Sequence, residues 1–166
     1  MGQYTVDKID PNLCTHVIHA FAYVNIETYE IMSGDFLADI TNKGYEDIAA
    51  LKTKAPQLKV MISVGGWTDS NKDPNKYFNL VSNANNTNTF VKSVVAFLRR
   101  YNFDGIDVAW EPEKFTSVHK AGLANLVAAL KAVLKPLGFL LSALVSAHIH
   151  EIDDGKIDSV YYGYNI

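Results

Sequence analysis

Residues 103–112 read Phe103-Asp104-Gly105-Ile106-Asp107-Val108-Ala109-Trp110-Glu111-Pro112, the pattern of a buried strand that ends at a proline. Side chains alternate along a strand, so Asp107, Ala109 and Glu111 are expected on one face. Carboxylates on an otherwise apolar strand are costly to bury unless they are paired or functional. Asp107 is therefore expected deep in a site and Glu111 at its mouth. A general acid and a structural ion pair both remain open for Glu111.

Strands and helices alternate on either side of this stretch. Buried strands are predicted at 15–24, 59–64, 103–110, 138–145 and 158–164, and helices at 45–54, 87–101 and 116–134. The apolar run 15–24 is typical of a strand buried on both faces. Residues 68–75 are expected to form a polar loop, and 83–89 a loop leading into a helix cap. This order predicts an α/β fold with a parallel sheet.

A second strand end carries Ser63-Val64-Gly65-Gly66-Trp67. Paired glycines allow a sharp bend and the close approach of a ligand. The Trp67 ring offers a flat apolar face on which a sugar could stack. A tight turn with Trp67 in the core fits the same spacing, and the residues alone leave both readings open.

Composition excludes several classes of function. The 166 residues hold 15 Lys and Arg against 18 Asp and Glu, a net charge of −3, so a nucleic-acid partner is not expected. No apolar stretch approaches the roughly 20 residues of a membrane helix, and no signal peptide is visible. His148 and His150 lack a third ligand at metal spacing, and no phosphate-binding glycine pattern occurs, so neither a metal nor a cofactor is expected.

Three smaller features carry expectations of their own. Cys14, the only cysteine, is either a buried inert thiol or the partner of a cysteine outside this chain. His16 and His19 are expected to be packed or hydrogen-bonded in the core. Asn85-Asn86-Thr87 is a glycosylation sequon, which chance explains equally well.

The two strand ends together resemble motifs of glycoside hydrolase family 18, the chitinases and chitinase-like proteins. The family's Asp-Gly-x-Asp-x-Asp-x-Glu is matched by residues 104–111, and its Ser-x-Gly-Gly by residues 63–66. Residues 9–22 and Tyr162-Gly163-Tyr164-Asn165 match more loosely. The resemblance implies a partial (β/α)8 TIM-type barrel containing strands two to six. Because such a barrel needs about 250 residues, residues 1–166 are expected to be an incomplete catalytic-type domain, truncated at both ends.

The resemblance also implies a mechanism and a set of site residues. Glu111 would protonate the glycosidic oxygen while the substrate's own acetamido group acts as the nucleophile, and Asp107 would support a second aspartate. Tyr164 would donate to the acetamido oxygen. The other residues implied to bind substrate are Trp67, Gly65, Gly66 and Phe21.

One departure from the family pattern decides the predicted function. The second aspartate is Ala109 here, whose methyl group cannot stabilise a developing cation, and Asp107 is expected to be left as an unshared buried carboxylate. The sequence therefore predicts an extracellular chitinase-like protein that binds chitin or N-acetylglucosamine oligosaccharides with hydrolysis lost or impaired. The alternatives are a residual endochitinase using Glu111, an interaction or signalling protein without a sugar ligand, and a partial product without independent function. The resemblance also implies a partner for Cys14 upstream of this chain.

Overall fold

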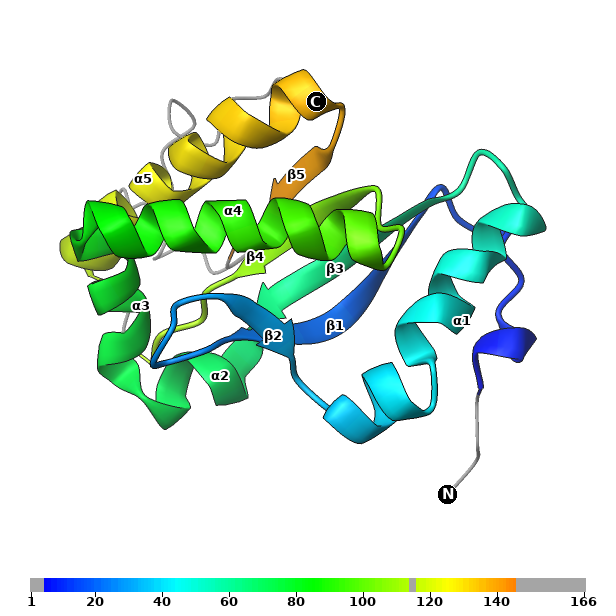
Figure 1. Cartoon of the computed structure of the whole chain (residues 1–166), viewed down its shortest axis with the longest axis horizontal. Helices are drawn as coiled ribbons and strands as arrows, with labels where there is room; N and C mark the ends of the chain where they lie inside the picture. Colours follow the sequence, from blue (N-terminus) through cyan, green and yellow to red (C-terminus); the bar gives the residue numbers. More distant parts are fainter. Residues whose placement is uncertain (1–4, 114–115, 146–166) are drawn as a thin grey trace.

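The computed structural model describes residues 5–113 and 116–145. Five strands form one sheet in the order β2-β1-β3-β4-β5 (Figure 1). Four of them run parallel: β1 (His16–Val24), β3 (Lys59–Gly65), β4 (Gly105–Ala109) and β5 (Leu140–Ala143). The short strand β2 (Ile31–Ser33) pairs antiparallel with the end of β1. The strand expected at 158–164 lies outside the described residues.

Helices connect the parallel strands, and the longer ones cover one face of the sheet (Figure 1). The α-helices are α1 (Gly44–Ala50), α2 (Gly66–Lys72), α3 (Pro74–Ser82), α4 (Ala84–Arg100) and α5 (Ser117–Leu134). Short helical turns are η1 (Val6–Lys8), η2 (Leu37–Thr41), η3 (Leu51–Thr53) and η4 (Lys135–Leu137). This arrangement confirms the predicted α/β class and is that of part of a (β/α)8 barrel.

The core lies between the sheet and helices α4 and α5. Val60, Ile62, Ile106 and Val108 from β3 and β4 are fully buried there. The helices contribute apolar stripes at helical spacing, as the sequence predicts. Their buried members are Phe90, Val94, Phe97 and Leu98 on α4, and Leu123, Leu126, Leu130 and Leu134 on α5.

Two segments predicted as loops are helical, and those predictions were wrong. Residues 68–72 belong to α2 and residues 74–75 begin α3, with Asp73 between the two helices. The Asp73 side chain accepts from Asn75 N and so caps α3, and Pro74 occupies its first turn. Helix α4 begins at Ala84, three residues before the predicted start, because the Asn83 side chain accepts hydrogen bonds from the main chain of its first turn.

Strand β1 is not buried on both faces, which corrects the prediction from its apolar run. Its exposure alternates from His16 to Ala20, and the Ile18 side chain is 45% exposed. Ala20 pairs in register with Ser63, so the exposed side chains lie on the sheet face opposite the helices. His16 is exposed and so lies outside the core, contrary to expectation, although its Nδ1 is hydrogen-bonded with Thr15 Oγ1 at 2.9 Å. His19 makes the expected hydrogen bond, 3.0 Å to Asp39.

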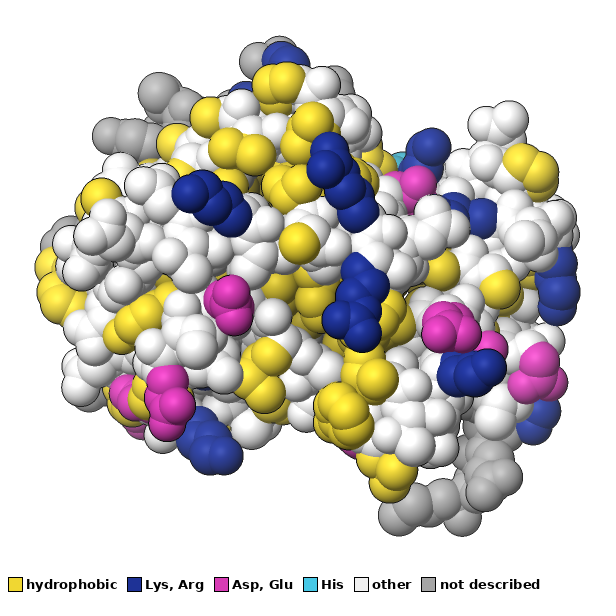
Figure 2. Space-filling view, viewed as in Figure 1, with side chains coloured by type: hydrophobic (Ala, Val, Ile, Leu, Met, Phe, Trp, Pro, Cys, Tyr) yellow, Lys and Arg dark blue, Asp and Glu magenta, His cyan; other side chains and the backbone are white. Residues whose placement is uncertain are grey.

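Other side chains are exposed as well. Cys14 is exposed, so the reading of a buried thiol is wrong. Figure 2 shows apolar side chains gathered on one part of the surface among scattered charged groups. Met32 of β2, together with Phe36 and Leu37 at the start of η2, is among the exposed apolar residues. Among the described residues, no helix has the length and apolar character needed to cross a membrane.

Candidate functional site

Asp107 lies within β4, and its carboxylate is held by two serines on the neighbouring strands. Ser63 of β3 donates to one carboxylate oxygen at 2.7 Å, and Ser142 of β5 donates to the other at 2.7 Å. The Asp107 residue is only 8% exposed, so these bonds replace water at both oxygens. The expectation of an unshared carboxylate at Asp107 was wrong, because the register aligns both serines with it.

Glu111 follows the carboxyl end of β4 by two residues, and side chains of α2 hold its main chain. Its N–H donates to Ser70 Oγ at 2.9 Å. Its carbonyl oxygen accepts from Asn71 Nδ2 at 2.9 Å, and Asn71 Oδ1 accepts from Glu113 N at 2.9 Å. The segment that carries the candidate acid is therefore fixed to a helix from the neighbouring strand–helix unit.

The paired glycines make the sharp bend from β3 into α2 and pack closely against protein atoms. Gly65 has a φ of 115°, and a Cβ there would lie 2.3 Å from Ala109 O. A Cβ at Gly66 would lie 2.8 Å from the Phe21 ring. The structure thus brings together Phe21 and Gly66, two predicted site residues. Because they have no side chain, the two glycines allow the chain to pack closely against Ala109 and Phe21.

Trp67 is the second residue of α2, and its side chain points into solvent. Its exposure of 59% excludes the reading that places it in the core. Asn71 Nδ2 also donates to Trp67 O at 2.9 Å, so one amide contacts the main chain of both Trp67 and Glu111. The exposed indole gives α2 an apolar surface next to the end of β3.

A buried polar cluster anchors α2 and α3 beneath this surface. The carboxylate of Asp69 accepts hydrogen bonds from Lys76 Nζ, from Tyr77 OH at 2.9 Å and from Val24 N at 3.2 Å. All three residues of the cluster are at most 5% exposed. Burial, and secondarily the charge of Asp69, raises the pKa of Tyr77 well above its usual value. Tyr77 therefore stays protonated and continues to donate.

Ala109 and Asp104 are the two other positions of the motif at residues 104–111 at which the family has an aspartate. Ala109 is fully buried at the end of β4, in register with Gly65, and supplies no polar side-chain group to the site. Asp104 lies just before β4, at the opposite end of the strand from Glu111. Its carboxylate accepts from Val60 N at 2.8 Å and pairs with Lys52 at 3.1 Å, so it has a structural role there.

Several predicted residues cannot be placed. Tyr164, together with His148 and His150, lies outside the described residues. Across residues 5–113 and 116–145, no three His, Cys, Asp or Glu side chains gather as metal ligands would.

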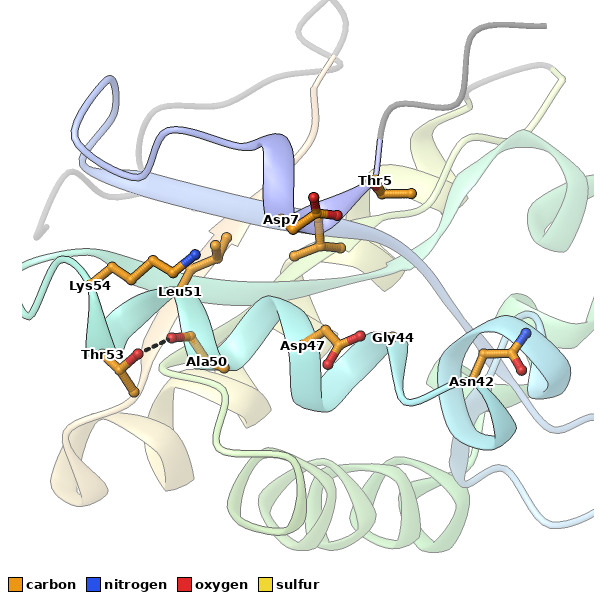
Figure 3. Close-up of a pocket in the computed structure, with 10 residues that line it drawn as sticks. Thr5, Asp7, Asn42, Gly44, Asp47, Ala50, Leu51, Thr53 and Lys54 are labelled. Carbon is orange, nitrogen blue, oxygen red and sulfur yellow. Dashed lines mark hydrogen bonds between the residues drawn. The ribbon is translucent and has the colours of Figure 1, made fainter.

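Several grooves flank the described fold, and two of them have similar volumes. One, of about 590 Å³, lies between η1 and α1 and contains none of the predicted site residues (Figure 3). Its lining includes Asp7, Asp47 and Lys54. The other, of about 570 Å³, lies between α2 and the β1–β2 connection and includes Tyr23, Asp69 and Lys72. The second groove adjoins the helix that carries Trp67.

Sequence reasoning missed the residues that support the site. It assigned no role to Ser142, Ser70, Asn71 or the Asp69 cluster. The polar residues of 66–77 are visible in the sequence, but only the fold shows that Asp69, Ser70 and Lys76 are buried and bonded to other parts of the chain. Ser142 could have been found only from the register of β5.

Comparison with known proteins identifies the family. Glycosyl hydrolases family 18 matches residues 1–164. The chain is 38% identical to probable chitinase 10 of Drosophila melanogaster over 162 residues, which are 93% of this chain and 7% of that protein. It is 36% identical to probable chitinase 2 of the same organism, covering 92% of this chain and 32% of that protein. The chain thus spans well under half of these curated relatives.

Solved structures agree. Catalytic domain 2 of the group II chitinase of Ostrinia furnacalis has a TM-score of 0.82 and 42% identity, covering 91% of this chain and 40% of that one. Human YKL-39, described as a pseudo-chitinase with retained chitooligosaccharide binding, has a TM-score of 0.75 and 30% identity, covering 90% of this chain and 40% of that one. Fold, motifs and sequence identity converge, and this chain belongs to glycosyl hydrolase family 18.

Proposed function

We propose that this chain carries part of a chitooligosaccharide-binding site whose hydrolytic step is impaired. The observation that carries the proposal is the exposed Trp67 ring on a helix that also holds the Glu111 main chain, with Ala109 buried between Asp107 and Glu111. Trp67 would supply a stacking face for a sugar ring. At Ala109 no carboxylate is available to orient an acetamido group or to stabilise a developing positive charge.

Two of the structural relatives support the sugar-binding part of this proposal, and the first also supports impaired hydrolysis. YKL-39 is described as keeping oligosaccharide binding as a pseudo-chitinase. Catalytic domain 2 of the Ostrinia furnacalis group II chitinase was solved, as an E2180L mutant, with an N-acetylglucosamine oligomer. By the family resemblance we also propose an extracellular location, where the exposed Asn85 of the sequon would be accessible to glycosylation.

Calorimetric titration of the chain with the tetrasaccharide of N-acetylglucosamine tests the proposal. Trp67→Ala should weaken binding by about tenfold, because the stacking face is lost. Phe78→Ala is the matched control, since Phe78 is also an exposed aromatic residue, 43% exposed, on the adjacent α3. Absence of binding at millimolar sugar would overturn the proposal and favour an interaction protein without a sugar ligand.

A residual endochitinase is the second candidate, because Glu111 is retained and its main chain is fixed by Ser70 and Asn71. In that case the chain should release reducing ends from a chitin oligomer, and Glu111→Gln should abolish the release. Turnover that is unchanged by Glu111→Gln would rule this candidate out.

A further inference from the structure

The side chain of Asn71 lies between the two elements that the proposed function uses. Its amide nitrogen donates to Trp67 O and to Glu111 O, each at 2.9 Å, and its amide oxygen accepts from Glu113 N at 2.9 Å. One side chain therefore joins the helix that carries the candidate sugar-stacking ring to the segment that carries the candidate acid. Only an amide presents two donors and an acceptor in this arrangement.

Ser70 completes the attachment from the adjacent position of α2. Its hydroxyl accepts the Glu111 N–H at 2.9 Å, so both main-chain polar groups of Glu111 are bonded to side chains of this helix. Ser70 is only 2% exposed, so water does not replace this bond readily.

Helix α2 is itself held in place by the buried contacts of Asp69. Asp69, between Thr68 and Ser70 in sequence, is 4% exposed and binds Lys76, Tyr77 and the main chain of Val24. Movement of α2 relative to the sheet would break these buried contacts, which makes the helix a rigid support.

We propose that Asn71 is a positioning residue that sets the Glu111 segment relative to Trp67, so that both contact one oligosaccharide. This inference rests on the proposed sugar-binding function and adds the residue that organises the site. Asn71 acts through the main chain of its neighbours and is not assigned contact with the sugar.

The test compares two substitutions at Asn71 with a control. Asn71→Ala removes the bridge, whereas Asn71→Asp is nearly isosteric, keeps the acceptor for Glu113 N and loses both donors. Asn88→Asp makes the same charge change at an exposed position of α4. Amide hydrogen exchange reports the bridge without any sugar, and titration with the tetrasaccharide of N-acetylglucosamine reports its effect on binding.

Asn71→Ala should raise the exchange rate of the Glu113 amide about tenfold, and Asn71→Asp should leave that amide protected. Both variants should weaken tetrasaccharide binding about fivefold with unfolding midpoints close to that of Asn88→Asp, which should bind normally. Unchanged exchange at Glu113 in Asn71→Ala, or affinities within about twofold of the unsubstituted chain in both variants, would overturn the inference. If the unsubstituted chain binds no sugar, the proposed function fails, and the exchange data still decide whether the bridge exists.

Discussion

Asp107 and Ser142 lie directly opposite each other on β4 and β5, and the serine hydroxyl donates to the carboxylate at 2.7 Å. With Ser63 on the other side, the carboxylate is held across three adjacent strands. In this chain Asp107 therefore has partners that do not depend on an aspartate at position 109. This explains how the buried carboxylate is accommodated beside Ala109.

Removing one of these donors should destabilise the fold. Ser142→Ala leaves one oxygen of a nearly buried carboxylate without its donor, and should lower the free energy of unfolding by about 1–3 kcal/mol. Urea denaturation measures this change. Ser82→Ala, at an exposed position at the end of α3, is the control and should change stability little. Equal stability of the two variants would show that the Asp107–Ser142 bond contributes nothing measurable.

The Asp69–Lys76 ion pair gives a second prediction. Lys76→Met should destabilise the fold by about 3–5 kcal/mol, because it leaves the Asp69 carboxylate buried without its cation. The double variant Asp69→Asn/Lys76→Met removes both charges and should recover part of this loss. Denaturation of the single and double variants measures the difference. A double variant less stable than Lys76→Met would contradict the account of an uncompensated charge.

The sequence predicted the features that depend on local pattern. The buried strand predicted at 103–110 contains β4, whose Ile106 and Val108 lie in the core, and the helix predicted at 87–101 lies within α4 except for its last residue. Strand β4 ends at Ala109, one residue before the predicted end and shortly before Pro112. These signals come from the spacing of apolar residues within one helix or strand, so each can be recognised from its own segment of sequence.

Features that depend on pairing between elements could not be predicted. The polar residues of α2 and α3 have the composition of a loop, and the sequence does not show that they pair. Only the fold brings Lys76 to Asp69, for example. The exposure of Ile18 depends on what covers the sheet, not on the residues of β1. Ser142 becomes a partner of Asp107 only through the register of β5, which sequence pattern does not fix.

The raised pKa of Tyr77 predicts a pH dependence of stability. The folded state holds Tyr77 protonated, chiefly by burial, whereas the unfolded chain loses this proton near pH 10. Above that pH the unfolded state binds fewer protons, so the free energy of unfolding falls as pH rises. Between pH 8 and pH 11 this group alone should lower the free energy of unfolding by on the order of 1 kcal/mol.

Tyr77→Phe isolates this contribution. The variant should be less stable at pH 8 by about 1–2 kcal/mol, because Asp69 loses a hydrogen bond, but it has no phenol to titrate. The difference in unfolding free energy between the unsubstituted chain and Tyr77→Phe should therefore narrow, by on the order of 1 kcal/mol, between pH 8 and pH 11. A difference that stays constant over this range would mean that Tyr77 titrates equally in the two states.

Ala109→Asp tests directly whether position 109 limits hydrolysis. The new carboxylate would enter a fully buried position two residues from Asp107, so the variant should be less stable than the unsubstituted chain. It should nevertheless raise the rate of hydrolysis of a chitin oligomer on the order of 10²-fold, the scale of one preorganised electrostatic partner.

Ala109→Asn matches the shape without the charge and should give a smaller gain. Adding Glu111→Gln to Ala109→Asp should remove the gain, because no acid then protonates the leaving oxygen. Reducing-end release measures all these rates, and an Ala109→Asp variant that folds and binds sugar without any gain would show that Ala109 is not the limiting defect.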